Sequence, residues 1–96
     1  MSQLDKIRQL KTDIYRIVNK YNVGRVYVFG SCARREDTQE SDIDLLVEFH
    51  NASLFEHIQL ENDMAALFQR PVDVVSLKAL KDDAFGRKVR QEMVLL

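Results

Sequence analysis

Apolar residues recur every three or four positions over the first twenty residues of the chain, as they do on one face of a helix. The positions are Leu4, Ile7, Leu10, Ile14, Ile17 or Val18, and Tyr21. This spacing predicts a single helix over residues 2–21, with Ser2 as its N-cap and Asn22 and Gly24 beyond its end. Its amphipathic pattern indicates that the helix covers one face of a sheet.

Three shorter runs are rich in β-branched and aromatic residues and are typical of strands. They span about residues 25–29, 43–49 and 72–76. A short helical turn is expected over residues 31–35, and a polar loop over residues 36–41. Strands that alternate with helices in this way predict an α/β fold.

A second long helix is predicted between the second and third strands, over residues 53–69. Ser53 and Glu56 are spaced as a capping box, and Pro71 blocks any continuation of the helix. Its buried stripe is expected at Leu54, Ile58, Met64, Ala65 and Phe68.

The last twenty residues, 77–96, predict a broken helical tail that Gly86 weakens in the middle. The inner face of this tail would consist of Leu80, Phe85, Val89 and Met93. The apolar end, residues 93–96, either packs on the sheet or belongs to a partner interface.

Composition narrows the class of protein. Ninety-six residues predict one domain over residues 1–96, and 30% charged with 46% hydrophobic residues suits a globular protein in water. The net charge of −1 gives no basic field, so no direct contact with nucleic acid is expected. The single Cys32 excludes an internal disulfide, and no apolar run is long enough for a membrane span. We therefore expect a cytoplasmic protein without membrane contact.

Two aspartates stand out at the start of the second strand. Residues two apart on a strand point to the same face, so Asp42 and Asp44 are expected side by side. Adjacent carboxylates repel, and at least one pKa should rise unless a cation joins them. Mg²⁺ is the natural cation, because it binds one or two protein carboxylates and completes its shell with water and phosphate oxygens.

Phosphate-binding chemistry is expected at the end of the first strand. Gly30 and Ser31 form a strand-to-helix turn that offers backbone N–H groups and a hydroxyl, although Ser31 also suits an ordinary N-cap. Arg34 either reaches a triphosphate as a fork of donors or makes a surface salt bridge. Cys32 is expected to be a small buried residue rather than a reactive thiol.

A third aspartate, Asp73, interrupts the apolar third strand. A charge in a buried run is costly unless it is paired or bound to metal; the alternative is an edge carboxylate that faces solvent. Ser41 either orients Asp42 or is a turn residue. His50 and His57 are expected to be solvated, and two histidines without a partner pattern do not make a zinc site. The absence of GxxxxGK[ST] excludes a P-loop enzyme.

The string GSCARR…SDIDLLVEF, from Gly30 to Phe49, resembles the signature of the DNA polymerase β-like nucleotidyltransferases, in particular the minimal nucleotidyltransferases. Asp73 fits the third carboxylate that this family has on a later strand. Many members have glycine where Arg35 stands. The resemblance implies a small mixed sheet of about three to four strands flanked by helices.

The same resemblance implies metal-assisted nucleotidyl transfer. One or two Mg²⁺ ions would be held by Asp42, Asp44 and Asp73, with Asp73 as metal ligand or as base for the attacking hydroxyl. Gly30 and Ser31 would cradle the β- and γ-phosphates of ATP, the expected nucleoside triphosphate.

Minimal nucleotidyltransferases often pair with a small helical HEPN protein as antitoxin and toxin. The resemblance implies transfer of AMP from ATP to a tyrosine of such a partner, in a hetero-oligomer. Two alternatives are a non-catalytic nucleotide-binding module that neutralises its partner by binding, and nucleotidyl transfer to a small-molecule hydroxyl.

Overall fold

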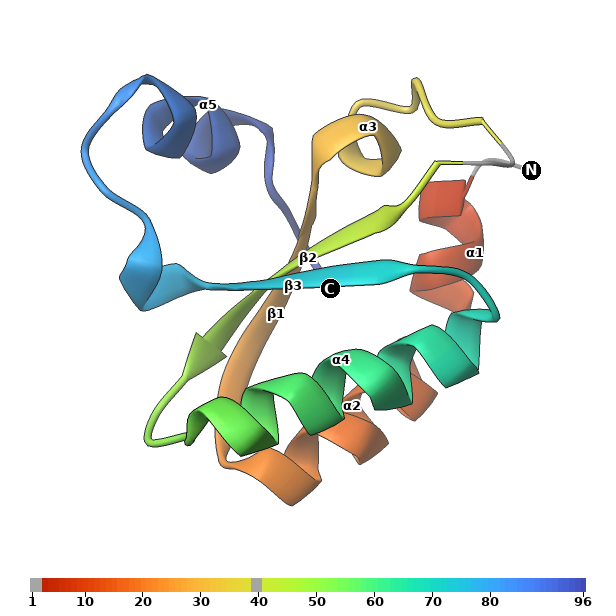
Figure 1. The fold of residues 1–96 in the computed structure, drawn as a ribbon. Coiled ribbons are helices and arrows are strands. Elements are labelled where there is room, and N and C mark those ends of the chain that lie inside the picture. Colours follow the sequence, from red (N-terminus) through yellow and green to blue (C-terminus); the bar gives the residue numbers. More distant parts are fainter. Residues whose placement is uncertain (1–2, 39–40) are drawn as a thin grey trace.

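A four-stranded mixed sheet forms the centre of the computed structural model, which describes residues 3–38 and 41–96 (Figure 1). Its strands are β1 (Val23–Phe29), β2 (Ile43–Phe49), β3 (Val72–Ser76) and β4 (Val94–Leu95), in the order β3-β2-β1-β4. β1 runs antiparallel to β2 and β4, whereas β2 and β3 are parallel. The predicted mixed sheet is confirmed, and β1 begins two residues earlier than predicted.

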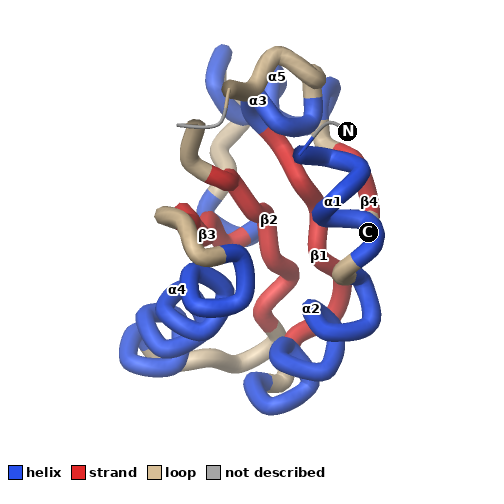
Figure 2. The backbone as a smooth tube through the Cα atoms, turned by 90° about the vertical axis from the view of Figure 1, so that its right-hand side faces the viewer, coloured by secondary structure: helices blue, strands red, loops and turns tan. Residues whose placement is uncertain are grey.

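Helices lie on both faces of this sheet. Helices α1 (Gln3–Gln9), α2 (Lys11–Val18) and α4 (Leu54–Phe68) cover one face, and α5 (Ala84–Glu92) packs on the other (Figures 1 and 2). Within the described residues, no helix has both the length and the apolar character that a membrane span requires.

The main core lies between the sheet and α1, α2 and α4. Side chains of β2 alternate between the two faces, as the strand period of two requires. Leu45 and Val47 enter the main core, whereas Leu46 packs with Phe29 and Val89 under α5. The aspartate face of β2 is therefore the α5 face.

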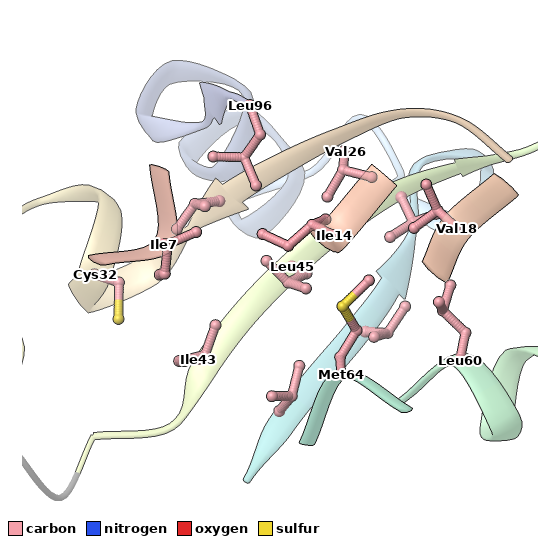
Figure 3. Packing of buried hydrophobic residues seen from close by; sticks show 14 of the residues in the cluster. Ile7, Ile14, Val18, Val26, Cys32, Ile43, Leu45, Leu60, Met64 and Leu96 are labelled. Atoms are coloured by element: carbon pink, nitrogen blue, oxygen red, sulfur yellow. The ribbon is translucent and has the colours of Figure 1, made fainter. Parts of the chain in front are cut away.

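The predicted helix over residues 2–21 is interrupted at Leu10. Leu10 N–H lies 3.2 Å from Lys6 O and 3.0 Å from Ile7 O, which marks a tightened turn between α1 and α2. The bend brings Ile7 beside Cys32 and Ile14 beside Leu45 (Figure 3). Apolar spacing continues across the bend, so periodicity alone predicts one helix; Ser2 lies outside the described residues.

The predicted apolar stripe of α4 is partly wrong. Its capping box is present, with Ser53 Oγ accepting from Glu56 N–H. Met64 is buried as predicted, together with Leu60, whereas three apolar residues near the N-terminal end are exposed: Leu54 (76%), Phe55 (67%) and Ile58 (50%). At 3.6 residues per turn, Phe55 and Ile58 lie on the side of the helix opposite Leu60 and Met64.

The predicted helical tail is also corrected. It consists of a 3₁₀ turn (Leu77–Ala79), α5 and the short strand β4. Val89 is buried as predicted, but Phe85 is 59% exposed. Leu96 N–H donates to Val26 O at 2.9 Å, and Tyr15 Oη donates to Leu96 O at 2.9 Å. The apolar end of the chain therefore packs on the sheet.

Helix α4 also closes the outer edge of β3. Glu61 Oε2 accepts from Val74 N–H at 2.9 Å, and His57 Nε2 lies 2.8 Å from Val74 O. His57 also stacks on Phe49, with ring centroids 5.0 Å apart. The prediction that His57 is solvated is wrong, because an edge strand needs partners for its free backbone groups and His57 supplies one of them.

Candidate active site

The three predicted aspartates gather where β2 and β3 begin. Asp44 is the second residue of β2, and its Cα partners in the sheet are Phe29 on β1 and Asp73 on β3. Asp42 directly precedes β2. Because alternate strand residues share a face, Asp42 and Asp44 belong to the same side as Leu46, the side on which α5 packs.

The turn after β1 touches the Asp44 carboxylate. Helix α3 (Gly30–Ala33) begins at Gly30, whose φ is +73°, a conformation that favours glycine. A Cβ on Gly30 would collide with Asp44 Oδ2. The backbone of Gly30 thus lies directly against the Asp44 carboxylate, and any larger residue at position 30 would separate the two.

The electrostatics of Asp44 reflect this crowding. Partial burial raises the pKa of the Asp44 carboxyl above its ordinary value, and the neighbouring charges of Asp73 and Asp42 raise it further. The positive charge of Arg34 opposes this and lowers the Asp44 pKa. The three carboxylates are therefore close enough to repel one another, as the sequence predicts.

The chemistry of these donors fits a hard divalent cation. Three carboxylates whose mutual repulsion raises a pKa form a site that a cation would relieve, and carboxylate oxygen is the ligand that Mg²⁺ prefers. Within the described part of the chain, no three His, Cys, Asp or Glu side chains converge closely enough to hold a metal as they stand. Asp42 and Asp73 are exposed, so their side chains have room to turn toward Asp44.

Arg34 lies beside this cluster in a pair of ion pairs. Its Nε donates to Glu36 Oε2 at 3.1 Å, and its Nη1 donates to Glu92 Oε2 at 2.9 Å. The salt-bridge alternative for Arg34 is confirmed. Arg34 is also close enough to Asp44 for its charge to lower that pKa, and its contact with a triphosphate stays a prediction.

Arg35 adopts the left-handed conformation that a glycine would take most easily. Its φ is +59°, and its Nη1 pairs with Asp5 Oδ2 at 3.2 Å. An L-residue in this region is strained, which explains why glycine suits the position. The ion pair with Asp5 helps to hold Arg35 in place despite that strain.

Comparison with known protein families identifies the family of this chain. Residues 12–96 match the family described as "Polymerase beta, Nucleotidyltransferase". The chain belongs to this nucleotidyltransferase family. The match covers both strands that carry the aspartates and the turn at Gly30.

A curated relative and a solved structure agree with this nucleotidyltransferase assignment. The "Protein adenylyltransferase MntA" of Thermococcus cleftensis is 37% identical over 76 residues, covering 78% of this chain and 76% of the relative. The "Structure of putative minimal nucleotidyltransferase" has a TM-score of 0.83 at 32% identity, covering 100% of this chain and 97% of that one.

A toxin–antitoxin complex shares the fold of this nucleotidyltransferase. That structure is described as "tri-AMPylated Shewanella oneidensis HEPN toxin in complex with MNT antitoxin". Its TM-score is 0.68 at 18% identity, covering 92% of this chain and 69% of the matched chain. At this identity the likeness concerns the fold.

The structure bears on the alternatives that the sequence left open for Asp73 and Ser41. Asp73 is exposed on the edge strand β3, as the alternative of an edge carboxylate requires, so burial gives no support to a metal-binding role. Its role as a metal ligand stays a prediction. Ser41 Oγ accepts from Thr38 N–H at 2.9 Å, which makes Ser41 a turn residue. Cys32 is buried as predicted, and burial raises the pKa of its thiol to about 11.

Sequence reasoning missed Glu92, which bonds Arg34 from 58 residues away. Glu92 stands at the end of α5, in a stretch that the apolar pattern predicts only as a helical tail. Nothing in local spacing relates Glu92 to the turn after β1, because the contact depends on how α5 packs over the sheet.

Proposed function

We propose that the chain is a Mg²⁺-dependent protein adenylyltransferase that moves AMP from ATP to a tyrosine hydroxyl of a small helical HEPN partner and thereby neutralises a toxin. The observation that carries the proposal is the pairing of Asp44 with Asp73 across β2 and β3, next to Asp42 and against Gly30. Family membership supports nucleotidyl transfer, and the names of the relative and of the solved complex support AMP and a HEPN partner.

In this reaction each residue has a role set by its position. Asp42, Asp44 and Asp73 would hold the metal, and Gly30 and Ser31 would face the β- and γ-phosphates. Bound Mg²⁺ would polarise the phosphates and make the attacking hydroxyl more acidic. Arg34 would supply positive charge beside the phosphates.

Transfer forms a bond between the tyrosine oxygen and the α-phosphorus, and breaks the bond from that phosphorus to the oxygen bridging the β-phosphorus. Pyrophosphate leaves with the bonding electrons. The hydroxyl proton passes to Asp73 when that carboxylate is not a metal ligand, and otherwise to water. Because Asp73 is exposed at the sheet edge, an acceptor held by another protein can approach it.

The test uses purified chain, the HEPN-type partner, Mg²⁺ and ATP labelled at the α-phosphate. We expect the wild type to label the partner. The rate of labelling by Asp42→Asn or Asp44→Asn should fall by about a hundredfold or more. Asp82→Asn is the matched control, because Asp82 is 89% exposed and pairs only with Arg87 among the contacts observed in the described chain.

Labelling at the wild-type rate by Asp42→Asn would contradict the assignment. If the wild type and Asp42→Asn bind and neutralise the partner equally without labelling it, the chain acts as a binding module. Label that appears in small molecules alone would instead identify a small-molecule acceptor.

A further inference from the structure

Two carboxylates fix the guanidinium of Arg34 in one orientation. Glu36 accepts from Nε, and Glu92 accepts from Nη1. Within residues 3–38 and 41–96, Nη2 makes no hydrogen bond. An arginine held in this way keeps one edge of its planar fork for a further acceptor.

The two carboxylates differ in how firmly they are held. The Glu36 side chain is 67% exposed and lies only two residues from Arg34 along the chain, in the turn that follows α3. The Glu92 side chain is 21% exposed. It stands on α5, which Val89 anchors against Phe29 and Leu46. A partly buried ion pair from a packed helix restricts Arg34 more than an exposed local one does.

Arg34 is held on the aspartate side of the molecule. Helix α5 packs on the sheet face that carries Asp44, and Arg34 follows the Gly30 turn that touches the same carboxylate. The edge of Arg34 that remains available is thus next to the place where phosphates of a bound nucleotide would lie.

We propose that Glu92 is a positioning residue for nucleotide binding: from α5 it holds Arg34 so that Nη2 donates to the terminal phosphate oxygens of a nucleoside triphosphate beside Asp44. The inference rests on the proposed function, which supplies the triphosphate. An arginine that is already ordered loses less conformational freedom on binding, so its hydrogen bonds contribute more to affinity.

This inference is tested by calorimetric titration in the presence of Mg²⁺, which measures the affinities for AMP and for AMP-PNP, a non-hydrolysable triphosphate. We expect Glu92→Ala to weaken AMP-PNP binding about three- to tenfold and to change AMP binding little. Glu92→Gln keeps an acceptor oxygen and removes a negative charge, so it should retain at least wild-type affinity. Glu36→Ala, the matched control on the same guanidinium, should have the smaller effect.

Circular dichroism and thermal unfolding of each variant establish that it is folded. The inference is overturned if folded Glu92→Ala binds AMP-PNP as tightly as the wild type or more tightly, or if AMP and AMP-PNP lose affinity equally. Failure of Glu92→Gln to retain affinity, or failure of the wild type to bind AMP-PNP, also overturns it. A wild type that binds AMP-PNP yet transfers no label refutes the proposed function alone, because the binding comparison still decides the role of Glu92.

Discussion

The contact between Gly30 and Asp44 shows how one residue type secures the site. Gly30 has a positive φ, and the Asp44 carboxylate occupies the space where a Cβ would stand. Two independent constraints, backbone conformation and close approach, therefore require glycine. The conformational cost of glycine in the unfolded chain is offset by a turn that passes directly against the Asp44 carboxylate.

The substitution Gly30→Ala is expected to reduce the free energy of unfolding by about 2 kcal/mol, because it combines left-handed strain with a displaced Asp44. It should also abolish transfer. Denaturant unfolding measures the first effect. Gly24→Ala is the control: there a Cβ would meet only the ends of the Glu48 and His50 side chains, at 2.7 and 2.8 Å. Equal losses in the two variants would contradict the specific role of Gly30.

At the scale of elements, α4 both joins β2 to β3 and caps the outer edge of β3. A parallel pair requires a crossover, and here the crossover helix supplies side chains to the strand that it positions. Glu61 and His57 together satisfy the N–H and C=O of Val74. The backbone groups of Val74 on this edge are consequently not available for pairing with another strand.

Removing the Glu61 carboxylate is expected to open that edge. Glu61→Ala leaves Val74 N–H without its acceptor and should lower the free energy of unfolding by about 2 kcal/mol. Concentration-dependent light scattering should rise as the freed edge pairs between molecules. Glu61→Gln keeps an acceptor oxygen and should behave almost as the wild type. Loss of stability in Glu61→Gln as large as in Glu61→Ala would count against the hydrogen bond.

Prediction of the elements succeeded where one local rule dominates. β2 and β3 are bounded by turn residues and by Pro71, and the capping box marks the start of α4. It failed where tertiary packing decides: the bend at Leu10, the exposed Leu54 and Ile58, and the change from helix to strand at β4. β4 pairs with Tyr27 and Val28 of β1, which lie too far away in the sequence for a local pattern to predict the pairing.

For the whole molecule, the aspartate cluster makes stability depend on pH and on cations. The folded-state pKa of Asp44 is raised, so the folded chain binds its proton more tightly than the unfolded chain does. The resulting stabilisation is fully present in acid, below the unfolded pKa. It is lost as pH rises through the folded pKa.

Without Mg²⁺, Asp44→Asn is therefore expected to unfold at a higher temperature than the wild type near pH 7. The difference should shrink as the pH falls through the raised pKa of Asp44, because the wild-type carboxyl is then protonated. Added Mg²⁺ should raise the melting temperature of the wild type and have little effect on Asp44→Asn. Differential scanning calorimetry measures both. A wild type that is the more stable protein at pH 7 without Mg²⁺ would refute the repulsion.

The site itself was predictable in part. Asp42, Asp44 and Gly30 follow from strand period and turn chemistry, and their proximity needs only β1 and β2 to pair as neighbours. The proximity of Asp73 to this group depends on the parallel pairing of β3 with β2, which was not predicted. The family resemblance predicted only that Asp73 is a third carboxylate on a later strand. Glu92 was not predictable, because its contact with Arg34 depends on the packing of α5.

The parallel pairing of Asp44 with Asp73 also constrains when the molecule can act. The hairpin of β1 and β2 can form early, since its contacts are local, but the third aspartate arrives only after α4 has folded and β3 has docked. During synthesis, the chain up to residue 76 must have left the ribosome before all three carboxylates can come together. A partly made or partly folded chain therefore lacks the complete site, and the capacity to bind a cation there reports that folding has finished.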